Sequence, residues 1–187
     1  MKIIELKQFR KLKIGFERQQ NLSIKNYDKL ETNMTANENS INDQRTVVIE
    51  LALATHASSY GLLGATFLPS NPNEENTLSV EVRFNDERIP FQESLSIHKN
   101  CSYLGLEKVY AQSILSSVIE FFSSRSVPAG KLIFDTSAHC EVGSSPLIFS
   151  CITEILLDIL LNCYDKISDQ ELEELCEKHL QKRYTTH

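Results

Sequence analysis

Residues 77–84, TLSVEVRF, alternate between apolar and polar positions, which is the pattern of a strand with one buried face. Two earlier runs, 46–56 and 60–69, are rich in aliphatic and β-branched residues and predict two largely buried strands. Gly61 and Gly64 in the second run permit a bulge or a close backbone approach. A further strand is predicted to begin at Lys131.

Residues 105–124 change to helical periodicity, with apolar positions on one face and polar residues opposite. Residues 146–163 are apolar nearly all round and predict a central helix that is covered on most sides. Its polar residues predict one narrow solvated stripe: Ser150, Glu154, Asp158 and Asn162. A last helix is predicted to start at Ser168, which forms a capping box with Glu171, and His179 belongs to its apolar face.

These patterns divide the chain into three parts. Residues 1–31 mix basic and apolar positions and fit a strand, a helix or both. Residues 32–44 have almost no apolar content and predict a flexible loop. Residues 45–187 predict a single α/β domain. The fold class we expect is α+β: a single βα sandwich, with an about four-stranded sheet, two helices packed on one face and a C-terminal helix.

Charge is distributed unevenly along the 187 residues. The first 25 residues carry seven Lys and Arg against two Glu, whereas the remainder carries 12 basic and 23 acidic residues. An acidic body argues against RNA binding by the whole domain, because phosphate contacts need Lys and Arg. The basic residues of the N-terminal segment are candidate contacts for RNA or for an acidic partner, with a plain solvated segment as the alternative: Lys7, Arg10, Lys11, Lys13 and Arg18.

The five cysteines are an odd number and form no CxxC motif. This usage predicts buried free thiols in a reducing compartment, cytoplasmic or nuclear, rather than a disulfide framework. No metal site and no cofactor are expected. No apolar run approaches the length of a membrane span, and the charged N-terminus does not fit a signal peptide, so we expect no membrane association.

The stretch 139–149, HCEVGSSPLIF, places a histidine beside a cysteine at the end of the strand that begins at Lys131. Strand alternation puts Cys140 toward the core and His139 on the opposite face, which excludes a Cys–His nucleophilic pair. Asp135 and His139 share the polar face and are candidates for acid–base catalysis. The alternative, which we favour, is the polar outer face of a half-solvated sheet.

Gly143, Ser144, Ser145 and Pro146 predict the start of a helix. Either serine can cap the helix, and Pro146 suits its first turn. Ser144 and Ser145 are also candidates for anion binding, because the amides at such an end attract anions. Capping requires no ligand, and no Walker lysine accompanies the serines, so we favour capping alone.

The order of elements over residues 45–163 resembles a known superfold. The matching pieces are RTVVIELALATH, GLLGATFLPSNP, TLSVEVRF, GLEKVYAQSILSSVIEFF, VPAGKLIFDTSAHC and SSPLIFSCITEILLDIL. They are similar to the ribonuclease PH-like subunits of the RNA exosome, whose superfold is shared with the fourth domain of elongation factor G. Active members carry an Arg-rich phosphate loop and a catalytic acid in their later half. This chain lacks both, and residues 124–126, Ser-Arg-Ser, do not replace them.

The resemblance therefore implies a non-catalytic subunit or assembly factor of an intracellular multiprotein complex, in RNA processing, whose partners are other protein subunits. An enzymatic function is the less favoured reading. Two alternatives remain open: a small enzyme that uses the polar face of strand 131–142, and an RNA-binding module that uses the basic N-terminal segment.

Overall fold

The computed structural model describes residues 1–6, 10–17, 19–23, 25–38, 41–53, 59–70, 76–85, 87–163 and 167–184. Nine strands in these residues form one sheet. Their bounds are β1 (Lys2–Leu6), β2 (Arg10–Gly15), β3 (Asp28–Thr35), β4 (Arg45–Leu53), β5 (Ser59–Pro69), β6 (Thr77–Phe84), β7 (Ile89–Pro90), β8 (Ser102–Leu104) and β9 (Gly130–Cys140). The predicted sheet of about four strands is therefore wrong.

The strands lie in the order β1-β2-β4-β5-β9-β6-β3, and β8 continues beside β9 and pairs with the short β7. All neighbours pair antiparallel except β6 and β9, which are parallel. A parallel pair needs a crossover connection, and the helix between β6 and β9 supplies it. β9 thus occupies the centre of the sheet although it is the last strand in the chain.

Three of the additional strands, β1, β2 and β3, form in the N-terminal part of the chain, whereas the short β7 and β8 lie between β6 and α1. β3 runs across residue 32, where the predicted flexible loop begins, and pairs with β6 over its full length. Only Leu30 and Met34 of β3 pack on the main core, and both are half-buried. Pairing with a well-formed neighbour, rather than the apolarity of β3 itself, stabilises this strand, because β propensity depends strongly on context.

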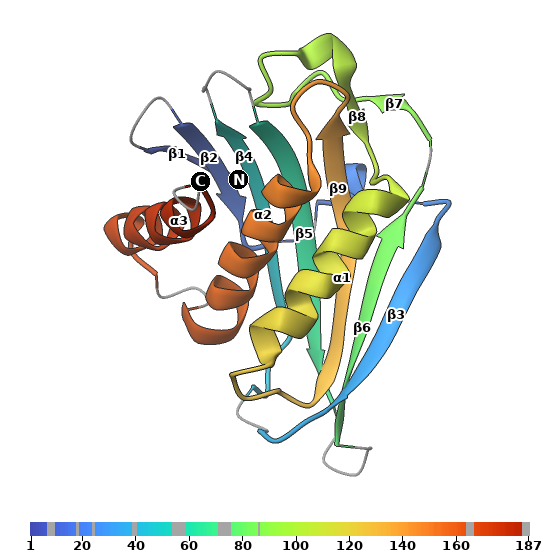
Figure 1. Ribbon diagram of the computed structural model, residues 1–187, viewed down its shortest axis with the longest axis vertical. Helices are drawn as coiled ribbons and strands as arrows, with labels where there is room; N and C mark the ends of the chain where they lie inside the picture. The colour runs from blue at the N-terminus through green and yellow to red at the C-terminus, as the bar shows by residue number, and fades with distance from the viewer. Residues whose placement is uncertain are drawn as a thin grey trace.

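Three helices lie on one face of the sheet (Figure 1): α1 (Lys108–Phe122), α2 (Pro146–Asp158) and α3 (Asp169–Tyr184). α2 continues into a π-helical turn, Ile159–Cys163, and two short 3-10 turns occupy Gln20–Leu22 and Lys99–Cys101. α1 and α2 cross the central strands, and α3 packs beside α2 near β1 and β2. No helix in the described ranges combines the length and the apolarity needed to cross a membrane.

Both faces of the sheet centre are covered. The main core fills the space between the sheet and the helices, and includes Leu63, Phe134 and Ile152. A smaller cluster lies on the opposite face, under residues 20–22 and 91–101. Its buried members are Leu22, Val48, Tyr60, Leu62, Phe91, Ala138 and Cys140. The sequence predicts that one face of strand 131–142 is half-solvated. This prediction is wrong for the second half of the strand, where side chains on both faces are buried.

A β-bulge in β9 explains the difference. Gly64 of β5 pairs with Thr136, whereas the next residue of β5, Ala65, pairs with Phe134, so Asp135 is an extra residue. An extra residue reverses the alternation of all side chains that follow it. Phe134 belongs to the main core, but Ala138 belongs to the smaller cluster on the other face. The single uninterrupted alternation predicted along strand 131–142 is wrong for this reason.

Candidate functional site

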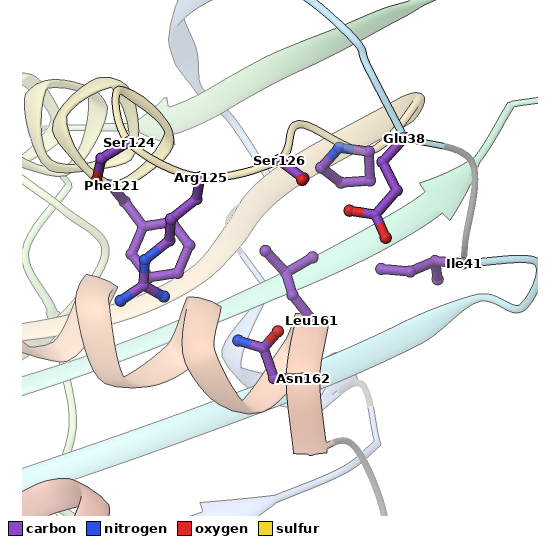
Figure 2. Close-up of a pocket in the computed structure, with 9 residues that line it drawn as sticks. Glu38, Ile41, Phe121, Ser124, Arg125, Ser126, Leu161 and Asn162 are labelled. Atoms are coloured by element: carbon purple, nitrogen blue, oxygen red, sulfur yellow. The ribbon is translucent and has the colours of Figure 1, made fainter.

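A cavity of about 550 Å³ lies where the C-terminal end of α1, the π-helical turn after α2 and the segment before β4 meet (Figure 2). Its lining combines both charges with neutral polar and apolar groups. The lining residues are Glu38, Ile41, Phe121, Ser124, Arg125, Ser126, Pro128, Leu161 and Asn162. Five of these residues come from the segment 121–128, two from residues 38–41 and two from residues 161–162, so the cavity forms only where the fold brings the three segments together.

Backbone hydrogen bonds fix the wall that carries Glu38. The amide of Glu38 donates to the carbonyl of Val127 at 3.1 Å, and the carbonyl of Glu38 accepts from the amide of Ala129 at 3.1 Å. The side-chain oxygen of Asn37 also accepts from the amide of Val127, at 2.7 Å. Residues 37–38 are thereby held against residues 127–129, which follow α1.

Arg125 forms the opposite end of the cavity. Its guanidinium lies over the ring of Phe121, 3.9 Å from the centroid, and one of its nitrogens forms an ion pair with Asp158. Stacking on an aromatic face stabilises a cation. The guanidinium is thus held in place through one face and one nitrogen, and no other hydrogen bond joins it to the described part of the chain.

Asp158 connects this cavity to a buried ion cluster between α2 and α3. Nε2 of His179 lies 2.7 Å from Oδ2 of Asp158, and Nδ1 lies 3.1 Å from Oε2 of Glu154. All three side chains are buried. The amide nitrogen of Asn162 donates to Oδ1 of Asp158 at 3.2 Å, so Asp158 accepts from both cavity-lining residues, Arg125 and Asn162.

The ion cluster changes the pKa values of its members. Burial alone raises the pKa of Asp158, but hydrogen bonds from His179 and Arg125 outweigh it, so the pKa is below its ordinary value of 3.8. Burial alone lowers the pKa of His179, but its hydrogen bonds to Asp158 and Glu154 outweigh this and raise the pKa above 6.5. The geometry thus favours a protonated His179 between two carboxylates.

This cluster corrects the predicted solvated stripe of the central helix. Glu154 and Asp158 are buried, because α3 lies on them and directs His179 between them. The sequence does contain the residues of this cluster: a histidine on the apolar face of the last helix, and two carboxylates one turn apart on the central helix. Recognising it required knowing that the two helices pack together.

The two predicted acid–base residues do not meet. His139 is 4% exposed and packs beside Tyr110 of α1, with Nδ1 3.1 Å from the carbonyl of Gly105 and Nε2 3.5 Å from Oε1 of Glu107. Asp135 accepts a hydrogen bond from Thr136 and lies 3.7 Å from Arg83.

A second cavity, of about 380 Å³, reaches His139 from the surface and is otherwise lined by Arg88, Glu107, Lys108 and Val109. Cys140 lies in the smaller cluster on the other face of the sheet, so its thiol and the imidazole of His139 are separated by the strand.

The two serines predicted to start the central helix are both used within the protein. Ser145 is the N-cap of α2, and its hydroxyl accepts from the amide of Ile148 at 3.4 Å. The hydroxyl of Ser144 accepts from the amide of Cys140 at 2.8 Å and donates to the carbonyl of Tyr60 at 2.7 Å. These contacts match the capping interpretation.

Of the predicted basic contacts, the structure describes the side chains of Lys11 and Lys13, both on β2. Lys11 is exposed on this strand. Lys13 is half-buried, and its amine lies 3.7 Å from Oε2 of Glu50. Arg10 begins β2, and its side chain is outside what the structure describes, as are Lys7 and Arg18 entirely.

Glu50 is a buried carboxylate on the sheet face opposite the helices. Its Oε1 accepts from the hydroxyl of Tyr60 at 3.0 Å and from the amide of Leu95 at 2.7 Å. Burial raises the pKa of Glu50, and these hydrogen bonds together with Lys13 offset only part of that effect. This arrangement secures the chain around Leu95 to the sheet.

Four cysteines with described side chains are free thiols: Cys101, Cys140, Cys151 and Cys176. Burial raises the pKa of the Cys176 thiol, which keeps it neutral and unreactive. Within the described ranges, no group of His, Cys, Asp and Glu is arranged to hold a metal ion.

Comparisons with protein-family models, with curated proteins and with solved structures found no match for this chain. The geometry described above therefore carries the functional argument.

Proposed function

We propose that this protein is a non-catalytic subunit or assembly factor of an intracellular multiprotein complex, and that it binds a partner strand at the open edge of β3. The observation that carries this proposal is the position of β3 at the end of the sheet order, paired with β6 on one side only. An open edge presents unpaired N–H and C=O groups, which an extended segment of another protein can pair with.

The surroundings of β3 suit an added strand that alternates apolar and polar residues. Tyr110 and Ser113 of α1 contact α2, so Leu115 and Ile119 lie on the opposite flank of this helix, toward β3. Leu115 is half-buried against the main core, and Ile119 is 47% exposed. A strand added beside β3 would bring every second side chain beneath this flank and continue the main core outward.

Charge favours a basic segment of another protein over a second copy of this chain. The protein carries a net charge of −6, so two copies repel each other. Asp28 and Glu31 on β3 add acidic groups near the edge, partly offset by Lys29, whose amine lies 2.8 Å from Glu31. Lys or Arg on the partner strand would complement them.

The contacts of the two candidate catalytic side chains support a non-catalytic role. Asp135 contacts Arg83 and Thr136, and His139 contacts Gly105 and Glu107, so each is engaged within the fold. The free thiols support an intracellular location. RNA processing is the setting that the resemblance to exosome subunits suggests.

Proline substitution on β3 tests the edge directly. Neighbouring residues of a strand direct their N–H groups to opposite sides. Of the two variants Glu31→Pro and Thr32→Pro, one therefore removes an N–H that faces β6. The other removes an N–H that faces the open edge. The variant that keeps the wild-type melting temperature is the edge variant. Its matched control is the equivalent pair on the other end of the sheet, Ile3→Pro and Ile4→Pro in β1.

The assay is capture of partners from host lysate by the tagged full chain, followed by titration of the purified partner. We expect the edge variant of β3 to bind the partner at least about tenfold more weakly, and the fold-retaining β1 variant to bind as the wild type does. Undiminished binding by the edge variant would contradict the proposal. If light scattering shows a wild-type homodimer that dissociates in the edge variant, the added strand comes from a second copy of this chain and not from another protein.

A further inference from the structure

We propose that the cavity between Arg125 and Glu38 binds a small zwitterion of peptide type, a free amino acid or a short peptide with an apolar side chain. The ligand carboxylate would contact Arg125, and its ammonium group would contact Glu38. Figure 2 shows these two side chains at opposite ends of the cavity, with Leu161 between them. This inference does not depend on strand addition at β3, although Glu38 follows the last residue of β3, Thr35, by three positions.

Arg125 is prepared to bind a carboxylate. The ring of Phe121 and the ion pair with Asp158 hold its guanidinium in one orientation. A guanidinium binds carboxylates through paired N–H groups, and the contact with Asp158 uses a single nitrogen. Binding therefore needs little further ordering of this side chain, which reduces its entropic cost.

Glu38 is prepared to bind a cation. Its backbone is fixed to Val127 and Ala129, its side chain is exposed, and no described residue forms an ion pair with its carboxylate. The Glu38 carboxylate therefore offers an ammonium group a full negative charge at this end of the cavity. The C-terminal end of α1 adjoins the other end, beside Arg125.

The same features disfavour a polyanion such as phosphate. Asp158 already neutralises part of the charge of Arg125, and Glu38 would repel a second negative charge at the other end. Among the described lining residues, Arg125 is the one cation and Glu38 is the one carboxylate, so a ligand with one charge of each sign is the best match.

Apolar and neutral polar groups between the two charges define the rest of the ligand. Ile41, Pro128 and Leu161 line the cavity and would contact an aliphatic side chain. The hydroxyl of Ser126 and the amide of Asn162 are placed to bind peptide N–H and C=O groups. The volume of about 550 Å³ is in the range of small-molecule sites and accommodates more than one residue.

A length series is the first experiment. Titration calorimetry of the full chain with leucine, dileucine and trileucine measures which spacing of the two charges fits between Arg125 and Glu38. We expect one length to bind and the others to bind at least about tenfold more weakly, because only one length satisfies both charges. The amide and the N-acetyl derivative of the best ligand each lack one charge and should lose a similar factor.

Glu38→Gln is the decisive variant, because Glu38 lies at the surface and its carboxylate forms no ion pair with any residue that the structure describes. This variant should have the same affinity for the best ligand and for its N-acetyl derivative, because the contact with the ammonium group is lost. It should still bind the ligand with a free carboxylate more tightly than the amide derivative. Glu93→Gln, an exposed carboxylate remote from the cavity, is the matched control and should bind as the wild type does. Arg125→Lys supplies the second variant, and should weaken binding of the carboxylate while its melting temperature reports any loss of the Asp158 contact.

Three results would overturn the inference. One is the absence of binding for all three lengths at millimolar concentration. A second is equal loss of affinity for the amine and its N-acetyl derivative in Glu38→Gln, which would show that Glu38 does not contact the ammonium group. Preferential binding of inorganic phosphate over all the zwitterions would likewise assign the cavity to an anion and contradict the proposal.

Discussion

His179→Gln tests the buried ion cluster between α2 and α3 more sharply than any other single substitution. The two ring nitrogens of His179 bridge Glu154 and Asp158, at 3.1 and 2.7 Å. A glutamine is similar in size, but its single amide nitrogen reaches one of the two carboxylates at a time and carries no charge. The substitution therefore removes one charge-assisted hydrogen bond and the positive charge without opening a large cavity.

The expected loss follows from the strength of hydrogen bonds to charged groups. Each contributes about 1.5–3 kcal/mol, and the carboxylate that remains without His179 is buried, so we expect a loss of about 2–3 kcal/mol in the free energy of unfolding. For a chain of this size the corresponding decrease in melting temperature is about 5–10 °C. The loss should appear as weaker docking of α3 on α2.

The effect should depend on pH in a direction that the pKa shifts define. The pKa of His179 is raised above 6.5 in the folded protein, so the stability it contributes is fully present below pH 6.5 and is lost as the pH rises through the raised value. The pKa of Asp158 is lowered below 3.8, so its contribution is present above that pH and is lost on further acidification. The difference between wild type and His179→Gln should be largest between these two values.

Urea unfolding followed by far-UV circular dichroism at pH 5.5 and pH 9 measures this difference. His98→Gln is the matched control, since no described residue forms a hydrogen bond with the His98 side chain. The raised pKa of Cys176 keeps its thiol neutral over this range. A difference between wild type and variant that is the same at both pH values would refute the proposed charge on His179.

Two further substitutions test the local geometry. Ser145→Ala should lower the free energy of unfolding by about 1 kcal/mol, because it removes the cap that accepts from the amide of Ile148, and Ser145→Asp should restore most of it; a chemical unfolding curve of Ser145→Ala that coincides with the wild type would contradict this. His139→Ala should cost about 2 kcal/mol, because the buried Gly105 carbonyl loses its imidazole partner; calorimetry showing an unchanged melting temperature would instead favour a free catalytic histidine.

The sequence was sufficient for elements that carry their own complete pattern. The predicted strand at 77–84 coincides with β6, the run at 60–69 lies within β5, and the helical period at 105–124 contains α1. β6 and α1 each bury one apolar face and show its period, whereas β5 is buried on both faces and shows a continuous apolar run, so each pattern indicates the conformation directly.

Elements that depend on their neighbours could not be predicted in the same way. β3 has only two half-buried apolar residues and exists through its pairing with β6. The bulge at Asp135 leaves no mark in the hydrophobic pattern, because residues on both faces of β9 are buried beyond it. A single inserted residue thus reassigned His139 from a solvated face to a buried position beneath α1.

The cavity lay beyond the reach of sequence patterns for a different reason. Its charged ends, Glu38 and Arg125, are far apart in the chain and belong to segments without periodicity. In the sequence, residues 124–126 show only that they do not replace a phosphate loop, and residue 38 falls in a segment with the composition of a flexible loop. Their juxtaposition depends on the hydrogen bonds between residues 37–38 and 127–129, which no local pattern encodes.

The central place of β9 imposes an order on biosynthesis. β5 and β6 leave the ribosome first, yet they never touch along a ladder, since β9 must enter between them after α1 has been translated. Until β9 is available, the nascent chain contains two incomplete parts of the sheet, each with an unpaired edge strand that favours aggregation. Chains truncated before residue 130, where β9 begins, should therefore aggregate or require chaperones, and should not form a smaller stable domain.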